Sequence, residues 1–160
     1  MKHTLYIETS VVSYLAARPS RDLLIAARQE ATAELWSKLL SSALTGYVSP
    51  LVHQEAQRGD QEQARKRLDA LSSLAVLEID QEAQTLAEQI LSAQAVPAEY
   101  PDDALHMAVA AVNGMDVLVT WNFAHLNNPT ARMRIRQIVE DNGYRCPEVC
   151  SPEELLEMEL

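Results

Sequence analysis

Short apolar runs alternate along this chain with longer segments of helical periodicity. Thr4–Ile7 and Val117–Thr120 are rich in β-branched and apolar residues, as buried strands are. Tyr47–Ser49 and Ala75–Ile79 predict two further strands. Because helical segments separate these runs, the strands are expected to lie parallel with helices on both faces. The pattern predicts an α/β fold: three layers, α/β/α, with a central, mainly parallel sheet.

Helical spacing of apolar residues predicts the elements between the strands. A long amphipathic helix is expected from near Asp22 to near Ala43. The other predicted amphipathic helices pass through Val11–Leu15, Val52–Ala56, Gln61–Leu71, Ala83–Leu91, Met133–Val139 and the segment that begins at Ser151. Thr9 or Ser10 is expected to cap the first of them.

One helix differs from the others because it is apolar on every side. It opens at Asp103, ends near Gly114, and is predicted to be central and buried. Asp102 is expected to be its N-cap, and Asp103 could also serve only as a cap. The position of Asp103 at the mouth of a buried helix favours a functional role.

Length and composition indicate one domain, residues 1–160. The chain has 160 residues, 48% of them hydrophobic, with no Gly/Ser-rich or Pro-rich linker. The longest nearly apolar segment, Ala104–Val112, is too short to cross a bilayer, so we expect a soluble, cytoplasmic protein. Cys146 and Cys150 lack a second Cys/His pair for zinc and are expected to be reduced structural residues.

The formal charge of −10 argues against general attraction to nucleic acid. An RNA partner would have to bind through a local group of basic residues. The basic residues form three clusters: Arg18, Arg21 and Arg28; Arg58, Arg65, Lys66 and Arg67; and Arg132, Arg134 and Arg136. Solvated helix faces explain these clusters better than phosphate contacts do.

Four carboxylate or amide side chains each lie where an apolar run meets a helix or turn: Glu8, Glu55, Asp103 and Asn122. Ligands of parallel sheets bind beyond the carboxyl ends of the strands, where these residues are expected to converge. Clustered carboxylates raise one another's pKa unless a cation relieves the repulsion. Oxygen ligands favour Mg²⁺ or Mn²⁺, with Glu8, Glu55 and Asp103 as the metal-binding acids and Asn122 as a neutral donor.

Such a metal would activate water and neutralise charge on a scissile phosphate, which favours phosphodiester hydrolysis. Thr9 and Ser10 could contact water or phosphate, but helix capping is the preferred interpretation. His106 is interpreted as a hydrogen-bonded core histidine, since no carboxylate–histidine set completes a zinc triad. His125 could contact substrate or support its loop. Trp36 and Trp121 are interpreted as packing residues.

Three motifs, in order and spacing, resemble the PIN domains and, more narrowly, the VapC-type ribonuclease toxins of bacterial toxin–antitoxin pairs. They are Tyr6–Leu15, Asp103–His106 and Leu118–Leu126. The resemblance covers most of the chain and implies that Glu8, Glu55 and Asp103 bind metal, with Asn122 as the fourth site residue. The family spacing favours a site role for Glu55 over simple exposure to solvent.

The resemblance also implies a Mg²⁺- or Mn²⁺-dependent endoribonuclease, a cognate antitoxin protein and a homodimer. Two positions depart from the family pattern, which usually has aspartate at Glu8 and often at Asn122. Glutamate is one methylene longer, and an amide lowers the negative charge of the site.

Two alternatives remain at this point. A catalytically weak PIN fold that binds RNA or a partner protein would also explain the departures from the family pattern. A phosphatase on a similar sheet is disfavoured, because haloacid-dehalogenase-like phosphatases need an aspartate nucleophile with a second aspartate two residues later. Glu8-Thr9-Ser10 supplies neither.

Overall fold

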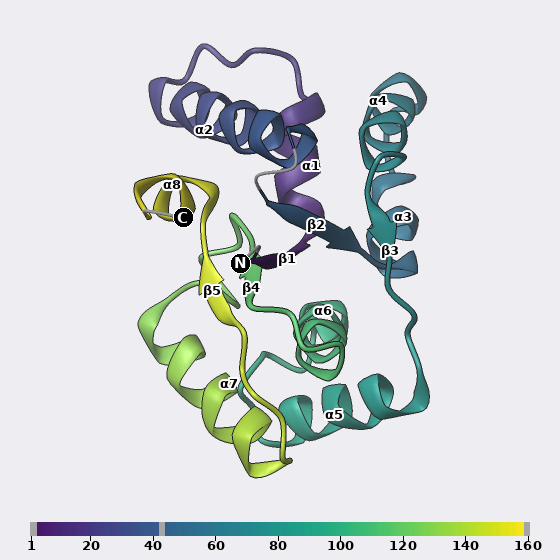
Figure 1. Ribbon diagram of the computed structural model, residues 1–160, viewed down its shortest axis with the longest axis vertical. Coiled ribbons are helices and arrows are strands. Elements are labelled where there is room, and N and C mark those ends of the chain that lie inside the picture. The colour runs from purple at the N-terminus through teal and green to yellow at the C-terminus, as the bar shows by residue number, and fades with distance from the viewer. Residues whose placement is uncertain (1–2, 42–43, 159–160) are drawn as a thin grey trace.

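A computed structural model describes residues 3–41 and 44–158 of the chain (Figure 1). Within these residues, five parallel strands form one sheet in the order β3-β2-β1-β4-β5. The strands are β1 Thr4–Ile7, β2 Thr45–Val48, β3 Ala75–Val76, β4 Val117–Val119 and β5 Glu148–Cys150. Since all five run the same way, their carboxyl ends share one edge of the sheet.

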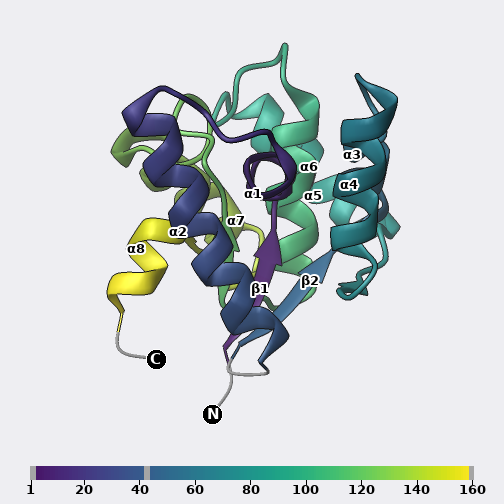
Figure 2. The ribbon, with the colours of Figure 1, turned by 90° about the horizontal axis from the view of Figure 1, so that it is seen from above.

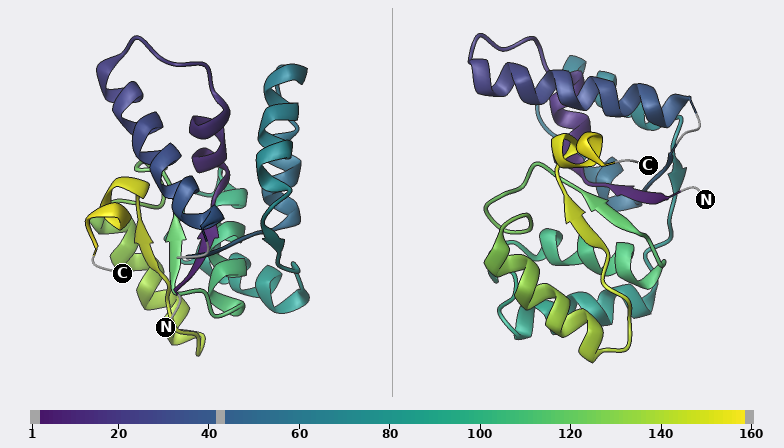
Figure 3. Two further views of the ribbon diagram at one scale, coloured as in Figure 1. Left: turned by 45° about the horizontal axis from the view of Figure 1, so that its top comes forward. Right: turned by 60° about the vertical axis from the view of Figure 1, so that its left-hand side comes forward.

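Eight helices in the described part of the chain surround the sheet. They are α1 Thr9–Ala16, α2 Leu23–Leu40, α3 Pro50–Ala56, α4 Gln61–Leu71, α5 Gln81–Ser92, α6 Pro101–Val112, α7 Pro129–Asp141 and α8 Pro152–Glu157. Helices α5, α6 and α7 cover one face, and α1, α2 and α8 cover the other (Figures 1 and 3). In Figure 2, α1 lies between α2 on one side and the α3–α4 pair on the other. The predicted three-layer α/β/α architecture is confirmed.

The core is centred on β1 and α6. Leu5, Tyr6 and Ile7 of the central strand are fully buried, as is Met107 of α6. The predicted burial of this all-round apolar helix is therefore confirmed. In the described ranges, no helix is both long and apolar enough to span a membrane.

Two helix starts differ from the prediction. Glu8, rather than Thr9 or Ser10, is the N-cap of α1, and its carboxylate accepts a hydrogen bond from the Ser10 N–H. Helix α6 begins at Pro101 with Tyr100 as its N-cap, so Asp102 lies inside the first turn instead of capping it. Proline suits the first helical position because its missing N–H would have no intrahelical partner there.

The strands also differ from the prediction at the two edges of the sheet. Strand β3 is only Ala75–Val76, both exposed, although Leu77 N–H still donates to Val48 C=O at 2.7 Å. Strand β5 was missed because Pro147 and Glu148 interrupt its short apolar signal.

The structure also shows the junction between β2 and α3 and the end of α2. Ser49 caps α3 instead of ending β2, and α2 ends at Leu40. The predicted end of that helix near Ala43 lies outside the described residues. Cys146 and Cys150 are free thiols, as expected, and burial raises the pKa of each to about 11.

Candidate metal centre

Glu8 is the buried acid of the site. It follows the central strand directly and is only 6% exposed. Its Oε1 accepts hydrogen bonds from Ser10 Oγ at 2.5 Å and Thr120 Oγ1 at 2.6 Å, and its Oε2 accepts one from Ser10 N–H at 3.2 Å. Bonds to ionised acceptors are the stronger kind, so these donors offset much of the cost of burying the charge.

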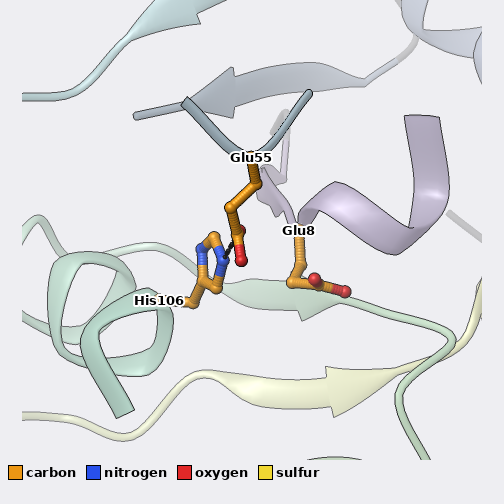
Figure 4. Close-up of side chains that lie close together, drawn as sticks. All are labelled: Glu8, Glu55 and His106. Atoms are coloured by element: carbon orange, nitrogen blue, oxygen red, sulfur yellow. Dashed lines mark hydrogen bonds and ion pairs between the residues drawn. The ribbon is translucent and has the colours of Figure 1, made fainter. Parts of the chain in front are cut away.

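Glu55 of α3 is held by a chain of buried hydrogen bonds. Its Oε1 lies 2.5 Å from Nε2 of His106 and accepts a bond from Thr9 Oγ1 at 2.7 Å. The other ring nitrogen of His106, Nδ1, lies 2.7 Å from the Tyr6 hydroxyl, which in turn lies 2.8 Å from Ser49 Oγ. These hydrogen bonds link β1, α1, α3 and α6 and fix the direction of the Glu55 carboxylate. Figure 4 shows the contact between Glu55 and His106.

The electrostatics of this hydrogen-bond network favour an ionised Glu55 beside a protonated His106. Burial alone raises the pKa of Glu55, but the hydrogen bond and charge of His106 hold it below its ordinary value. Burial alone lowers the pKa of His106, but the bond to Glu55 and the charges of Glu8, Glu55 and Asp103 raise it above its ordinary value. Burial likewise raises the pKa of the Tyr6 hydroxyl, which stays protonated as a donor.

Glu8, Glu55 and His106 form a compact group that could hold a metal ion, with one ligand atom from each residue all within 4.8 Å of one another. Both nitrogens of His106 already have partners, the Tyr6 hydroxyl and Glu55 Oε1. In contrast, no described residue hydrogen-bonds to Oε2 of Glu55. The donor chemistry therefore fits a hard divalent cation bound through carboxylate oxygens, with His106 orienting Glu55.

Asp103 and Asn122, the other two predicted site residues, bond to the loop that follows β4. Oδ2 of Asp103 lies 2.8 Å from Nδ1 of His125, whose ring stacks against Tyr100 at 3.9 Å between centroids. Oδ1 of Asn122 accepts the His125 backbone N–H at 3.0 Å. The compact group thus contains two of the four predicted residues. Asp103 lies one turn before His106 and acts on it through charge.

Several side chains near the site have roles that the sequence did not reveal. His106 is a buried, hydrogen-bonded histidine as expected, but its main partner is the site carboxylate Glu55. Thr9 and Ser10 also bond to the two glutamates rather than cap the helix. One signal pointed to His106: a single polar residue within an apolar helix, one turn after Asp103.

The two tryptophans are packing residues, as expected. Trp36 and Trp121 are both buried, and the Trp121 indole N–H donates to Thr32 Oγ1 at 2.9 Å.

Comparison with known proteins shows the family to which the chain belongs. The sequence profile of the PIN domain matches residues 5–126. The chain belongs to the PIN domain family. PIN domains are generally nucleases, and the match spans Glu8, Glu55, Asp103 and Asn122. No curated protein sequence matches this PIN domain.

A solved structure supports the fold. The crystal structure of VapBC2 from Rickettsia felis, bound to a DNA fragment from their promoter, matches with a TM-score of 0.56 and 15% sequence identity. The match covers 92% of this PIN domain and 98% of the other chain. At this identity the likeness concerns the fold.

Proposed function

We propose that this PIN domain is a metal-dependent endoribonuclease that hydrolyses RNA phosphodiesters and acts as the toxin of a toxin–antitoxin pair. The observation that carries the proposal is the pair of glutamates, Glu8 and Glu55, at the carboxyl edge of a parallel sheet. Two carboxylates this close repel each other, and a bound cation relieves the repulsion.

In this proposal Glu8 and Glu55 hold Mg²⁺ or Mn²⁺, and Asp103 and Asn122 complete the site from α6 and the loop after β4. When bound, such an ion polarises a phosphoryl oxygen and lowers the pKa of a bound water. The protein supplies the orientation. Ser10 and Thr120 hold the Glu8 carboxylate, and His106 holds that of Glu55. Outer partners of this kind typically change metal affinity about 10- to 100-fold when removed.

The proposed partners follow from the family and from the structural neighbour. This chain shares the fold of one chain in the crystal structure of VapBC2. We therefore propose a cognate antitoxin protein and a homodimer for this chain, and a cytoplasmic location where the RNA substrate is found.

A second candidate is a PIN fold that binds RNA or a protein with little catalysis. The favouring observation is that Asp103 and Asn122 both use side-chain oxygens to bond His125. If those bonds persist in solution, the site offers fewer free oxygens to a cation.

The test is cleavage of single-stranded RNA by the purified protein with Mg²⁺, with Mn²⁺ and with excess EDTA. We expect cleavage only with metal, and loss of cleavage of at least about 100-fold in Glu8→Gln, Glu55→Gln and Asp103→Asn, because each removes a charge that holds the ion. Glu34→Gln, on the exposed face of α2, is the matched control and should cleave normally.

Calorimetric titration with Mn²⁺ separates the two candidates. The nuclease proposal expects saturable binding that weakens in Glu8→Gln but not in Glu34→Gln. Cleavage that persists in EDTA would contradict a metal-dependent mechanism. Absence of both Mn²⁺ binding and cleavage, with RNA binding intact, would establish the binding module.

A further inference from the structure

The guanidinium group of Arg28 lies against two aromatic rings near the candidate metal centre. The guanidinium carbon of Arg28, on α2, is 5.5 Å from the ring centroid of Trp121 and 5.2 Å from that of Phe123. Its Nη1 also donates to the Tyr14 hydroxyl at 3.4 Å. Cation–π contact with two rings holds this arginine in one place. We call Arg28 and Phe123 together the Arg28–Phe123 platform.

The two rings differ in exposure. Trp121 is buried and hydrogen-bonded, while Phe123 is 40% exposed. Phe123 meets Trp121 edge-on, with centroids 6.2 Å apart and planes at 65°. Packing explains the buried indole fully. Phe123, the one phenylalanine of the chain, instead has a ring that is open to solvent and in contact with the Arg28 guanidinium, so it can still accept a stacked partner.

Hydrogen bonds connect the platform to the metal centre. The Trp121 backbone N–H donates to Ser10 Oγ at 2.9 Å, and the same hydroxyl donates to Glu8 at 2.5 Å. The Asn122 N–H donates to Thr120 Oγ1, which also bonds Glu8. The loop that carries Phe123 is therefore fixed to the residues that hold the buried acid.

We infer that the Arg28–Phe123 platform is a nucleotide subsite, where a base of single-stranded RNA stacks on Phe123 and Arg28 contacts the adjoining phosphate. The inference rests on the proposed function, because it places substrate across the acidic edge. Aromatic faces bind unpaired bases of any identity, and Arg adds charge and stacking. In a chain of net charge −10, a fixed cation beside the acids gives the RNA backbone a local point of attraction.

The test measures binding without cleavage. Fluorescein-labelled single-stranded oligouridine and oligoadenosine, each about eight nucleotides long, are titrated in EDTA and followed by anisotropy. We expect Phe123→Leu to weaken binding about fivefold or more, the lower range for loss of one stacked base. Phe123→Tyr keeps the ring and should bind as the wild type does. Arg28→Gln should weaken binding and reduce the salt slope by about one.

Matched controls come from exposed positions on two other helices, α7 and α4. Met133→Ala removes an exposed apolar side chain from α7, where Met133 is 74% exposed. Arg65→Gln removes an exposed arginine from α4. Both should bind as the wild type does, and thermal melts confirm that every variant is folded.

An abasic oligonucleotide gives a second measurement on the unaltered protein. An abasic site is introduced at each position of the oligonucleotide in turn. At one position it should weaken binding to the wild type, and at that same position it should not change binding to Phe123→Leu. If Phe123→Leu and Phe123→Tyr bind alike and no abasic position matters, the subsite is refuted while the nuclease proposal stands. If the wild type neither binds nor cleaves RNA, the proposed function fails and the subsite fails with it.

Discussion

Two histidine–carboxylate pairs involve α6, one with a buried histidine and one with a partly exposed histidine, while the two carboxylates are similarly exposed, 18% for Glu55 and 15% for Asp103. His106 is fully buried and pairs with Glu55 of α3 at 2.5 Å. His125 is 21% exposed and pairs with Asp103 of α6 at 2.8 Å. The buried pair has further bonds to Thr9 and, through the Tyr6 hydroxyl, to β1. The His125–Asp103 pair has the stacking contact of His125 with Tyr100 and the bond from the His125 backbone N–H to Asn122 Oδ1.

The two pairs have the same chemistry but hold their carboxylates with different firmness. A buried pair with all its donors matched has one arrangement, because any rotation leaves a polar group unsatisfied. The His125–Asp103 pair has fewer bonds to the surrounding elements, so exchanging one partner for water or a cation breaks fewer contacts. The Glu55 carboxylate is accordingly the more firmly held of the two, and the Asp103 carboxylate is the more easily redirected.

The largest expected effect comes from removing His106. His106→Leu should lower the free energy of unfolding by about 3 kcal/mol, since it leaves a carboxylate and a buried hydroxyl without their partner. Urea denaturation followed by circular dichroism measures the loss. In the same background, Glu55→Gln should cost less than it does alone, by about 1 kcal/mol, because the two residues act as a pair. Strict additivity would show that the buried pair is not coupled.

Removing His125 should cost less. His125→Ala is expected to lower the free energy of unfolding by about 1 kcal/mol or less, since solvent replaces most of its contact with Asp103. The same urea titration measures it. The comparison between the pairs is refuted if His125→Ala destabilises the protein as much as His106→Leu does. Tyr100→Leu, which removes the stacking ring but no charge, separates the two contributions of this contact.

The smallest effect is expected at Asp116, a carboxylate outside the site. The backbone N–H of Thr4, aided by Arg145, holds the pKa of Asp116 below its ordinary value of 3.8. Because the pKa of Asp116 is lower in the folded state, its ionised carboxylate stabilises the fold above pH 3.8. This contribution disappears as the pH falls through the pKa that Asp116 has in the folded state.

Asp116→Asn should therefore cost about 0.5 kcal/mol at pH 7, because the side chain is partly exposed. Thermal melts from pH 7 to about pH 2 measure the change. The gap to the wild type should close on acidification and not on raising the pH. A gap that widens in acid would contradict the assignment.

Much of the fold was predictable because periodicity reports burial. The runs at Thr4–Ile7 and Val117–Thr120 and the all-round apolar helix after Asp103 gave the sheet and its central helix. The proximity of Glu8 and Glu55 was predictable because each follows a strand of a parallel sheet, and the carboxyl ends of such strands share one edge. Strand β5 was not, since Pro147 and Glu148 hide a three-residue signal.

The partners of the acids could not be predicted, because they come from distant segments. Tyr6 and His106 are 100 residues apart, and no local pattern states that they touch. Likewise, nothing in the sequence indicates that Asn122 and Asp103 both bond to His125. Side-chain pairing depends on how helices and loops pack, and only the folded arrangement fixes it.

The central position of β1 has a consequence for how the protein is made. This first strand needs β4 as a neighbour, and Thr4 and its partner Asp116 are 112 residues apart in the chain. A ribosome must therefore synthesise most of the polypeptide before Glu8 can acquire its Thr120 partner. A truncated product that lacks β4 would leave Glu8 without its Thr120 partner, so the carboxyl edge of the sheet is complete only after about three-quarters of the chain has been made.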